Sequence, residues 1–169
     1  MKATRTVVIF SLLTVCSLAL VANAQETVAV LTAAELTRVL PTSFYFQGQN
    51  AATQIRNSAA ARFSANRYVI VGMVDTSGYA ADVRAKYQGF FITDSAVEIN
   101  GHDLRTGAYG FGFSDDGKIN VLDLSGKQIL LASTTKDNDV RRPRPLMMIK
   151  SGDGVRLYSG REYVTITSK

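Results

Sequence analysis

Two aspartates and one histidine, Asp75, Asp94 and His102, could carry acid–base chemistry. Asp75 follows an apolar run at residues 71–74 and precedes Thr76-Ser77-Gly78, which is typical of hydrolases whose paired aspartates share one proton. The glycine stands one residue late for that chemistry, and the best second aspartate, Asp94, is not followed by a glycine. A turn capped by Asp75 is therefore the favoured interpretation. A hydrolase centred on Asp75, assisted by Asp94 or His102, remains an alternative.

Metal and cofactor chemistry has little support in the sequence. His102 is the only histidine and Cys16 the only cysteine, so the usual structural zinc sites are excluded. Asp115-Asp116 and Asp137-Asn138-Asp139 place oxygen ligands on expected loops. Neither run continues into a calcium-binding loop with its glycine and closing glutamate. We expect no metal and no cofactor, and we assign no catalytic residue.

The segment 107–113 is the candidate ligand-binding strand. Alternation would place Tyr109, Phe111 and Phe113 on one face, and Gly110 and Gly112 on the other. A bare glycine face lets a ligand or another part of the chain approach closely. The five residues are therefore candidates for binding a small ligand. The favoured alternative is that the glycine face packs against a helix at residues 79–87.

Arg141, Arg142 and Arg144 form the densest positive charge after residue 24, interleaved with Pro143 and Pro145. Prolines hold such a segment extended, so its guanidinium groups could bind phosphate, a lipid head group or an acidic glycan. A polar connection between strands is the favoured alternative. No aromatic residue is interleaved for base stacking, so we expect no nucleic-acid partner.

The N-terminal residues 1–24 predict a cleaved secretory signal peptide. Lys2 and Arg5 precede an apolar run at residues 7–21, and Ala22-Asn23-Ala24 supplies a cleavage site before Gln25. The apolar run is shorter than the ~20 residues of a membrane span, so no permanent span is expected. Lipidation at Cys16 is the minor alternative. Cleavage would leave 17 basic and 14 acidic residues, a net charge of +3, and no cysteine. These features favour an exported bacterial protein, periplasmic or extracellular.

The remaining chain predicts an N-terminal lead and short helix at residues 25–41, followed by one β-domain at residues 42–169. Thr32 and Glu35 form a capping box, and Pro41 ends the helix. Alternating apolar residues and Gly-rich turns then predict about nine strands. They include an ambiguous segment at residues 50–63 and a strand buried on both faces at residues 67–75. The expected fold is mainly β, an antiparallel meander closed as a small barrel or folded as a β-sandwich.

These features favour a non-catalytic function. We expect an exported envelope or extracellular β-domain that binds a small apolar or amphipathic ligand, or an envelope protein as partner. The first alternative is an assembly subunit that uses strand edges, with its lead at residues 25–30 donated to a neighbour. The hydrolase centred on Asp75 is the second alternative.

Overall fold

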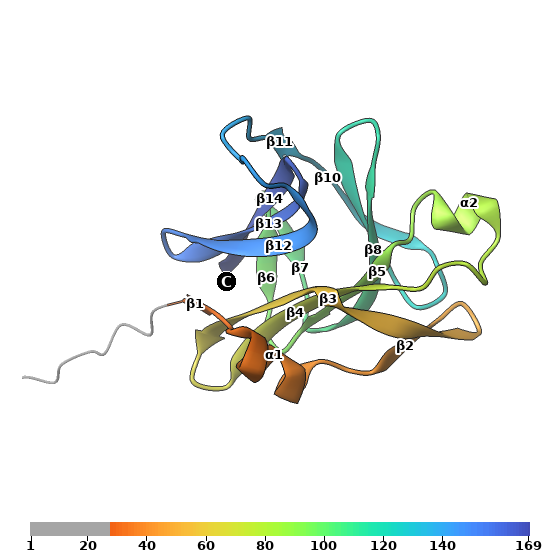
Figure 1. The fold of residues 1–169 in the computed structure, drawn as a ribbon, viewed down its shortest axis with the longest axis horizontal. Helices are drawn as coiled ribbons and strands as arrows, with labels where there is room; N and C mark the ends of the chain where they lie inside the picture. Colours follow the sequence, from red (N-terminus) through yellow and green to blue (C-terminus); the bar gives the residue numbers. More distant parts are fainter. Residues whose placement is uncertain (1–27) are drawn as a thin grey trace, which may run out of the picture.

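The computed structural model describes residues 28–169, which form two antiparallel β-sheets and two short helices (Figure 1). The predicted signal peptide lies outside the described residues. The mainly β class, the antiparallel pairing and the two helices are confirmed. Within residues 28–169 no strand pairing closes either sheet into a barrel.

The larger sheet has eight strands. Seven follow one another in the order β1, β3, β4, β5, β8, β9 and β10, and β2 pairs with β3 beside this path. Their bounds are β1 Ala29–Val30, β2 Ser43–Phe46, β3 Gln49–Ser64, β4 Arg67–Val74, β5 Gly89–Thr93, β8 Gly107–Ser114, β9 Lys118–Leu122 and β10 Gln128–Ser133. The ambiguous segment at residues 50–63 is thus a strand, as the sequence favoured.

The smaller sheet has six strands. Its order is β12, β13, β14, β6 and β7, and β11 pairs with β14. The bounds are β6 Val97–Ile99, β7 His102–Leu104, β11 Thr135–Lys136, β12 Arg144–Ser151, β13 Gly154–Gly160 and β14 Glu162–Ser168. The described chain therefore has more strands than the predicted nine. The additional strands include β1, β7 and β11, which span two or three residues and are too short to show an alternating pattern.

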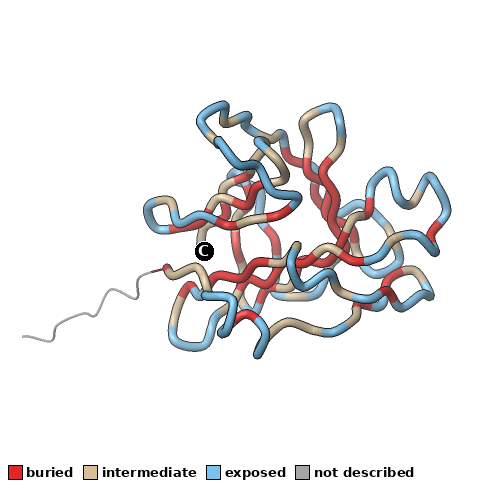
Figure 2. Tube along the Cα trace, in the orientation of Figure 1, coloured by how far each residue is buried: buried red, intermediate tan, exposed pale blue. Residues whose placement is uncertain are grey.

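Two apolar clusters cover the two faces of the larger sheet. One lies between the sheets and joins residues such as Val71 and Phe111 to Leu157 and Ile166 of the smaller sheet. The other lies on the opposite face, where α1, β2 and the segment around α2 contribute side chains. Strand β4 supplies residues to both clusters, so its predicted burial on both faces is confirmed (Figure 2).

The turn at Asn100-Gly101 joins β6 to β7, and both residues have positive φ. The Asn100 side chain also links distant strands. Its Oδ1 accepts a hydrogen bond from the Thr165 backbone N–H (2.7 Å), and its Nδ2 donates to the Ser133 carbonyl (2.7 Å). Asn100 therefore ties β14 of the smaller sheet to the end of β10 in the larger one.

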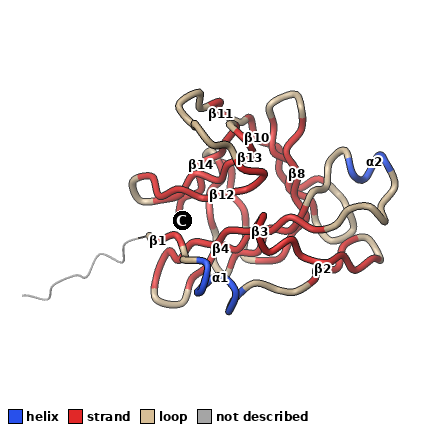
Figure 3. Tube along the Cα trace, viewed as in Figure 1, coloured by secondary structure: helices blue, strands red, loops and turns tan. Residues whose placement is uncertain are grey.

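The two helices are short (Figure 3). Helix α1, Ala33–Val39, has the predicted capping box. The predicted helix at residues 79–87 was too long, because only α2, Ala81–Arg84, is helical and its N-cap Ala80 makes no side-chain cap. Tyr87 instead stacks on Phe46, with ring centroids 3.9 Å apart. Burial of the flanking tyrosine, rather than helix propensity, determines the path of this segment.

Candidate functional site

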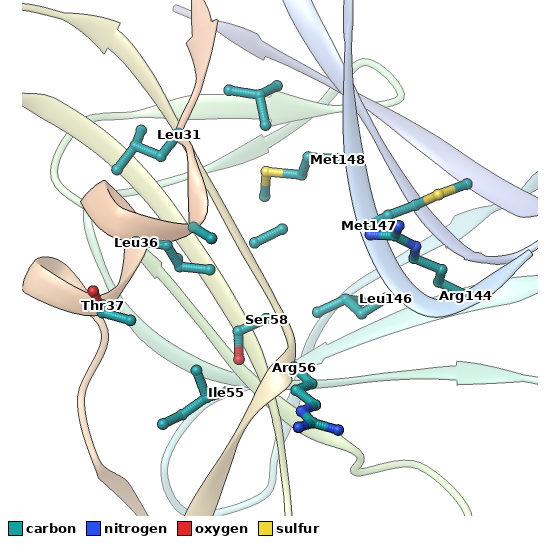
Figure 4. A pocket seen from close by; sticks show the side chains of 13 residues that line it. Leu31, Leu36, Thr37, Ile55, Arg56, Ser58, Arg144, Leu146, Met147 and Met148 are labelled. Carbon is teal, nitrogen blue, oxygen red and sulfur yellow. The ribbon is translucent and has the colours of Figure 1, made fainter.

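An apolar pocket of about 330 Å³ opens where an edge of the larger sheet faces an edge of the smaller one. Strand β3 forms one side, β12 the other, and β1 with α1 closes one end (Figure 4). We call it the β3–β12 pocket. Its lining residues are Val30, Leu31, Ala33, Leu36, Thr37, Ile55, Arg56, Ser58, Ala59, Arg144, Leu146, Met147 and Met148. Leu146 and Met148 also belong to the core between the sheets, so the pocket is the open margin of that core.

Both strands that face the pocket are bulged beside it. From Thr53 to Ser58, β3 advances by five residues while its partner β4 advances by only two. From Arg144 to Met147, β12 advances by three residues while β13 advances by two. Bulges bend a strand and redirect its side chains, and they recur beside functional sites. Here each bulge brings an arginine to the pocket.

Side-chain hydrogen bonds hold the β3 bulge in place. Ser58 Oγ donates to the Gln54 carbonyl (2.9 Å), and Asn57 Nδ2 donates to Gln54 Oε1 (2.7 Å). Gln54 Nε2 in turn donates to the Val74 carbonyl of β4 (3.0 Å). These bonds satisfy polar groups that the interrupted pairing leaves free. Ile55 consequently protrudes at the pocket, 56% exposed.

Helix α1 presents Leu36 to the pocket, and its capping box fixes the start of the helix. The Glu35 carboxylate accepts hydrogen bonds from the Thr32 N–H (2.9 Å) and hydroxyl (2.8 Å). These bonds hold the pKa of Glu35 below its ordinary value of 4.5. A carboxylate with a lowered folded-state pKa stabilises the fold at neutral pH, and this contribution is lost as the pH falls through that pKa.

Among the described residues that line the pocket, Arg56 and Arg144 are the only charged ones. Within residues 28–169, neither guanidinium pairs with a carboxylate. Both residues are exposed, whereas Leu36, Leu146 and Met148 are at least nine-tenths buried. The pocket thus combines an apolar floor with a positively charged rim.

Only one of the three predicted anion-binding arginines lines the pocket. Arg144 begins β12 and lines the pocket, while Arg141 and Arg142 are exposed on the preceding loop and do not line it. That loop is tethered to the smaller sheet, since Tyr158 Oη donates to Asp137 Oδ2 (2.8 Å). Anion binding at these arginines stays a prediction.

The predicted ligand strand is β8, and its aromatic face lies in the core. Phe111 and Phe113 belong to the cluster between the sheets, and Tyr109 packs against it. On the other face, an added Cβ at Gly110 would lie 2.5 Å from the Phe46 ring, and one at Gly112 would lie 2.6 Å from the Lys86 carbonyl oxygen. The glycines therefore admit neighbouring parts of the same chain. Ligand binding by this strand stays a prediction.

The residues proposed for hydrolysis are far apart. Asp75 follows β4 and accepts a hydrogen bond from the Ser77 N–H (3.0 Å), which lowers the pKa of its carboxyl. Asp94 lies at the other end of β4, where its N–H donates to the Tyr68 carbonyl (3.1 Å). Asp75 lies seven positions after Tyr68 along extended chain, which corresponds to roughly 23 Å, so the two aspartates cannot share a proton. His102 is exposed on β7, in the other sheet.

The N-terminal lead has a partner within the chain. Ala29 and Val30 pair antiparallel with Arg62 and Ala61 of β3, while residues 25–27 lie outside the described part. Donation of this lead to a neighbour, as the assembly alternative requires, would break that pairing.

Within residues 28–169, no three potential metal-binding side chains gather at one place. Neither described helix is long and apolar enough to cross a bilayer. Comparison with known proteins found no match, whether among protein-family models, curated proteins or solved structures.

Proposed function

We propose that this protein is an exported, non-catalytic β-sandwich that binds a small, largely apolar ligand in the β3–β12 pocket. The observation that carries this proposal is the pair of bulges, one in each sheet, that flank an apolar opening into the core between the sheets. The pocket volume of about 330 Å³ falls at the lower end of the usual range for small-ligand sites, about 300–1,000 Å³.

The form of the two edges favours a small molecule over an added peptide strand. A peptide that extends a sheet needs a regular ladder of free backbone groups. Strand β3 is bulged at residues 54–57, and β12 carries both a bulge and Pro145, which has no N–H to donate. Bulges and prolines are the means by which sheet edges resist pairing with another chain. Side chains, rather than backbone, therefore define what binds here.

The chemistry of the lining favours binding over catalysis. Its two hydroxyl groups are engaged locally: Ser58 Oγ donates to Gln54, and Thr37 Oγ donates to the Ala34 carbonyl (2.9 Å). Among the lining residues that the structure describes, no carboxylate or imidazole could act as their base. Met147 and Met148 supply flexible, polarizable surface that adapts to apolar ligands of different shape.

Two neighbouring alanines on α1 test the proposal. Both are exposed, but only Ala33 lines the pocket, so Ala33→Phe would fill it whereas Ala34→Phe would not. The chain from residue 25 contains no tryptophan whose fluorescence could report binding. The neutral dye Nile red therefore serves as the fluorescent probe of the pocket. We expect saturable binding of one dye per chain, about ten-fold weaker for Ala33→Phe and unchanged for Ala34→Phe, a difference of ~1.4 kcal/mol.

Circular dichroism would establish that both variants keep the fold of the unaltered protein. Absence of saturable dye binding to the unaltered protein would refute the proposed function. Equal affinity of the two variants would also refute it, because the dye would then bind elsewhere.

A further inference from the structure

We infer that the ligand of the β3–β12 pocket is a single-chain amphiphile whose anionic head group is bound by Arg56 and Arg144. This inference rests on the proposed function and specifies the class of ligand. A fatty carboxylate has the required chemistry, with a hydrocarbon chain for the apolar floor and a negative charge for the rim.

The two arginines reach the pocket from different sheets. Arg56 lies within the irregular part of β3, and Arg144 stands at the start of the bulge in β12. Figure 4 shows Arg56 below Ser58 and Arg144 beside Met147, with the apolar side chains of Leu36 and Leu146 nearer the middle of the view. An amphiphile with its chain on this floor would have its head group at the charged rim.

Within residues 28–169, no acidic side chain compensates the charge at the rim. No lining residue is acidic, and neither arginine forms an ion pair within the described part of the chain. The acidic residue of α1 nearest in sequence to this lining, Glu35, is engaged with Thr32 at the capping box. Guanidinium groups bind carboxylates strongly because their planar donors match the two oxygens. A ligand carboxylate would supply the missing negative charge.

The remaining charge and the size of the pocket agree with this ligand class. Arg141 and Arg142 are exposed on the loop that leads into β12, so their field attracts anions toward the same side of the molecule. The volume of about 330 Å³ is near the minimum for small-ligand sites. It therefore favours one hydrocarbon chain over the two chains of a phospholipid.

Competition against Nile red would test the head group separately from the apolar chain. The competitors are dodecanoate, dodecanol and dodecyltrimethylammonium, which share a chain length and carry negative, neutral and positive head groups. We expect dodecanoate to displace the dye at concentrations about ten-fold lower than dodecanol, and the cation to be the weakest. The preference for dodecanoate should decrease as salt is raised, because the arginines are exposed.

Variants of the arginines would show which side chains cause the preference for dodecanoate. Arg56→Gln and Arg144→Gln should each weaken dodecanoate binding several-fold, and the double variant about ten-fold or more, with dodecanol unaffected. Arg142→Gln is the matched control: it removes one charge from the same region, but Arg142 does not line the pocket. The altered side chains are exposed, so these variants should fold normally.

The outcomes separate this inference from the proposed function. If Nile red binds in the pocket but dodecanol competes as well as dodecanoate, the anionic head group is refuted and the pocket stands. Arg142→Gln could instead weaken dodecanoate binding as much as Arg56→Gln and Arg144→Gln do. The preference would then come from the general positive charge of this region and not from contacts with Arg56 and Arg144, and the inference is again refuted. If Nile red does not bind, the proposed function itself fails.

Discussion

Phe111→Ala is expected to lower the free energy of unfolding by about 3–5 kcal/mol. The Phe111 ring is fully buried between the two sheets and packs edge-to-face with Phe113, at a centroid distance of 6.2 Å. Its removal deletes apolar contacts and leaves a cavity. Strand β8 cannot close this cavity, because backbone pairing holds it between β5 and β9. Urea denaturation monitored by circular dichroism would measure the loss.

The matched control is Leu131→Ala on β10. Leu131 is 41% exposed, so its truncation should cost less than about 1 kcal/mol. The comparison also tests the candidate ligand strand at residues 109–113. A Phe111→Ala protein of nearly normal stability but with weakened ligand binding would identify the ring as a ligand wall, and would contradict its assignment to the core.

Gly89→Ala is expected to cost about 3 kcal/mol or more in the free energy of unfolding. Gly89 begins β5 and pairs with both Met73 and Phe111. An added Cβ would lie 2.0 Å from the Gly72 carbonyl oxygen and 2.8 Å from the Met73 Cα. Both are backbone atoms of β4, so relief requires the two central strands to move apart. The same denaturation experiment measures this effect.

Two other glycines provide controls for Gly89→Ala. A Cβ at Gly78 would approach only the flexible Gln49 side chain, at 3.2 Å, so Gly78→Ala should be close to neutral. Gly101 has open space but a φ of +79°, and Gly101→Ala should cost about 1–2 kcal/mol through backbone strain. A Gly89→Ala loss no larger than that of Gly78→Ala would mean that β4 and β5 do not pack as closely as described.

Local sequence patterns predicted the parts of this fold that local interactions determine. The Thr32–Glu35 capping box and the Asp75 turn depend on residues a few positions apart, and both are present. The buried strand at residues 67–75 was predictable because it contains an unbroken apolar run at residues 69–74 that is rich in β-branched side chains. The helix at residues 79–87 was predicted too long, because its helical spacing also suits Tyr79 and Tyr87 packing from an irregular segment.

The candidate pocket could not be predicted, because it depends on the pairing of distant strands. The sequence at residues 54–57 shows only an uncertain alternation, and the bulge becomes apparent when its register against β4 is known. Arg144 was singled out for its charge, yet nothing local indicates that it lines the same pocket as Arg56, which belongs to the other sheet. Pro145 within a strand was the one available signal of an irregular edge at β12.

The most direct test of the β3–β12 pocket is a dodecanoate titration followed by the methyl resonances of methionine. The sequence has four methionines, and the chain from residue 25 retains three of them. Met147 and Met148 line the pocket, whereas Met73 packs against the core on β4 and serves as an internal control. We predict saturable shifts at Met147 and Met148 with Met73 unchanged. Unchanged Met147 and Met148 resonances, or equal shifts at all three residues, would contradict the assignment of the pocket.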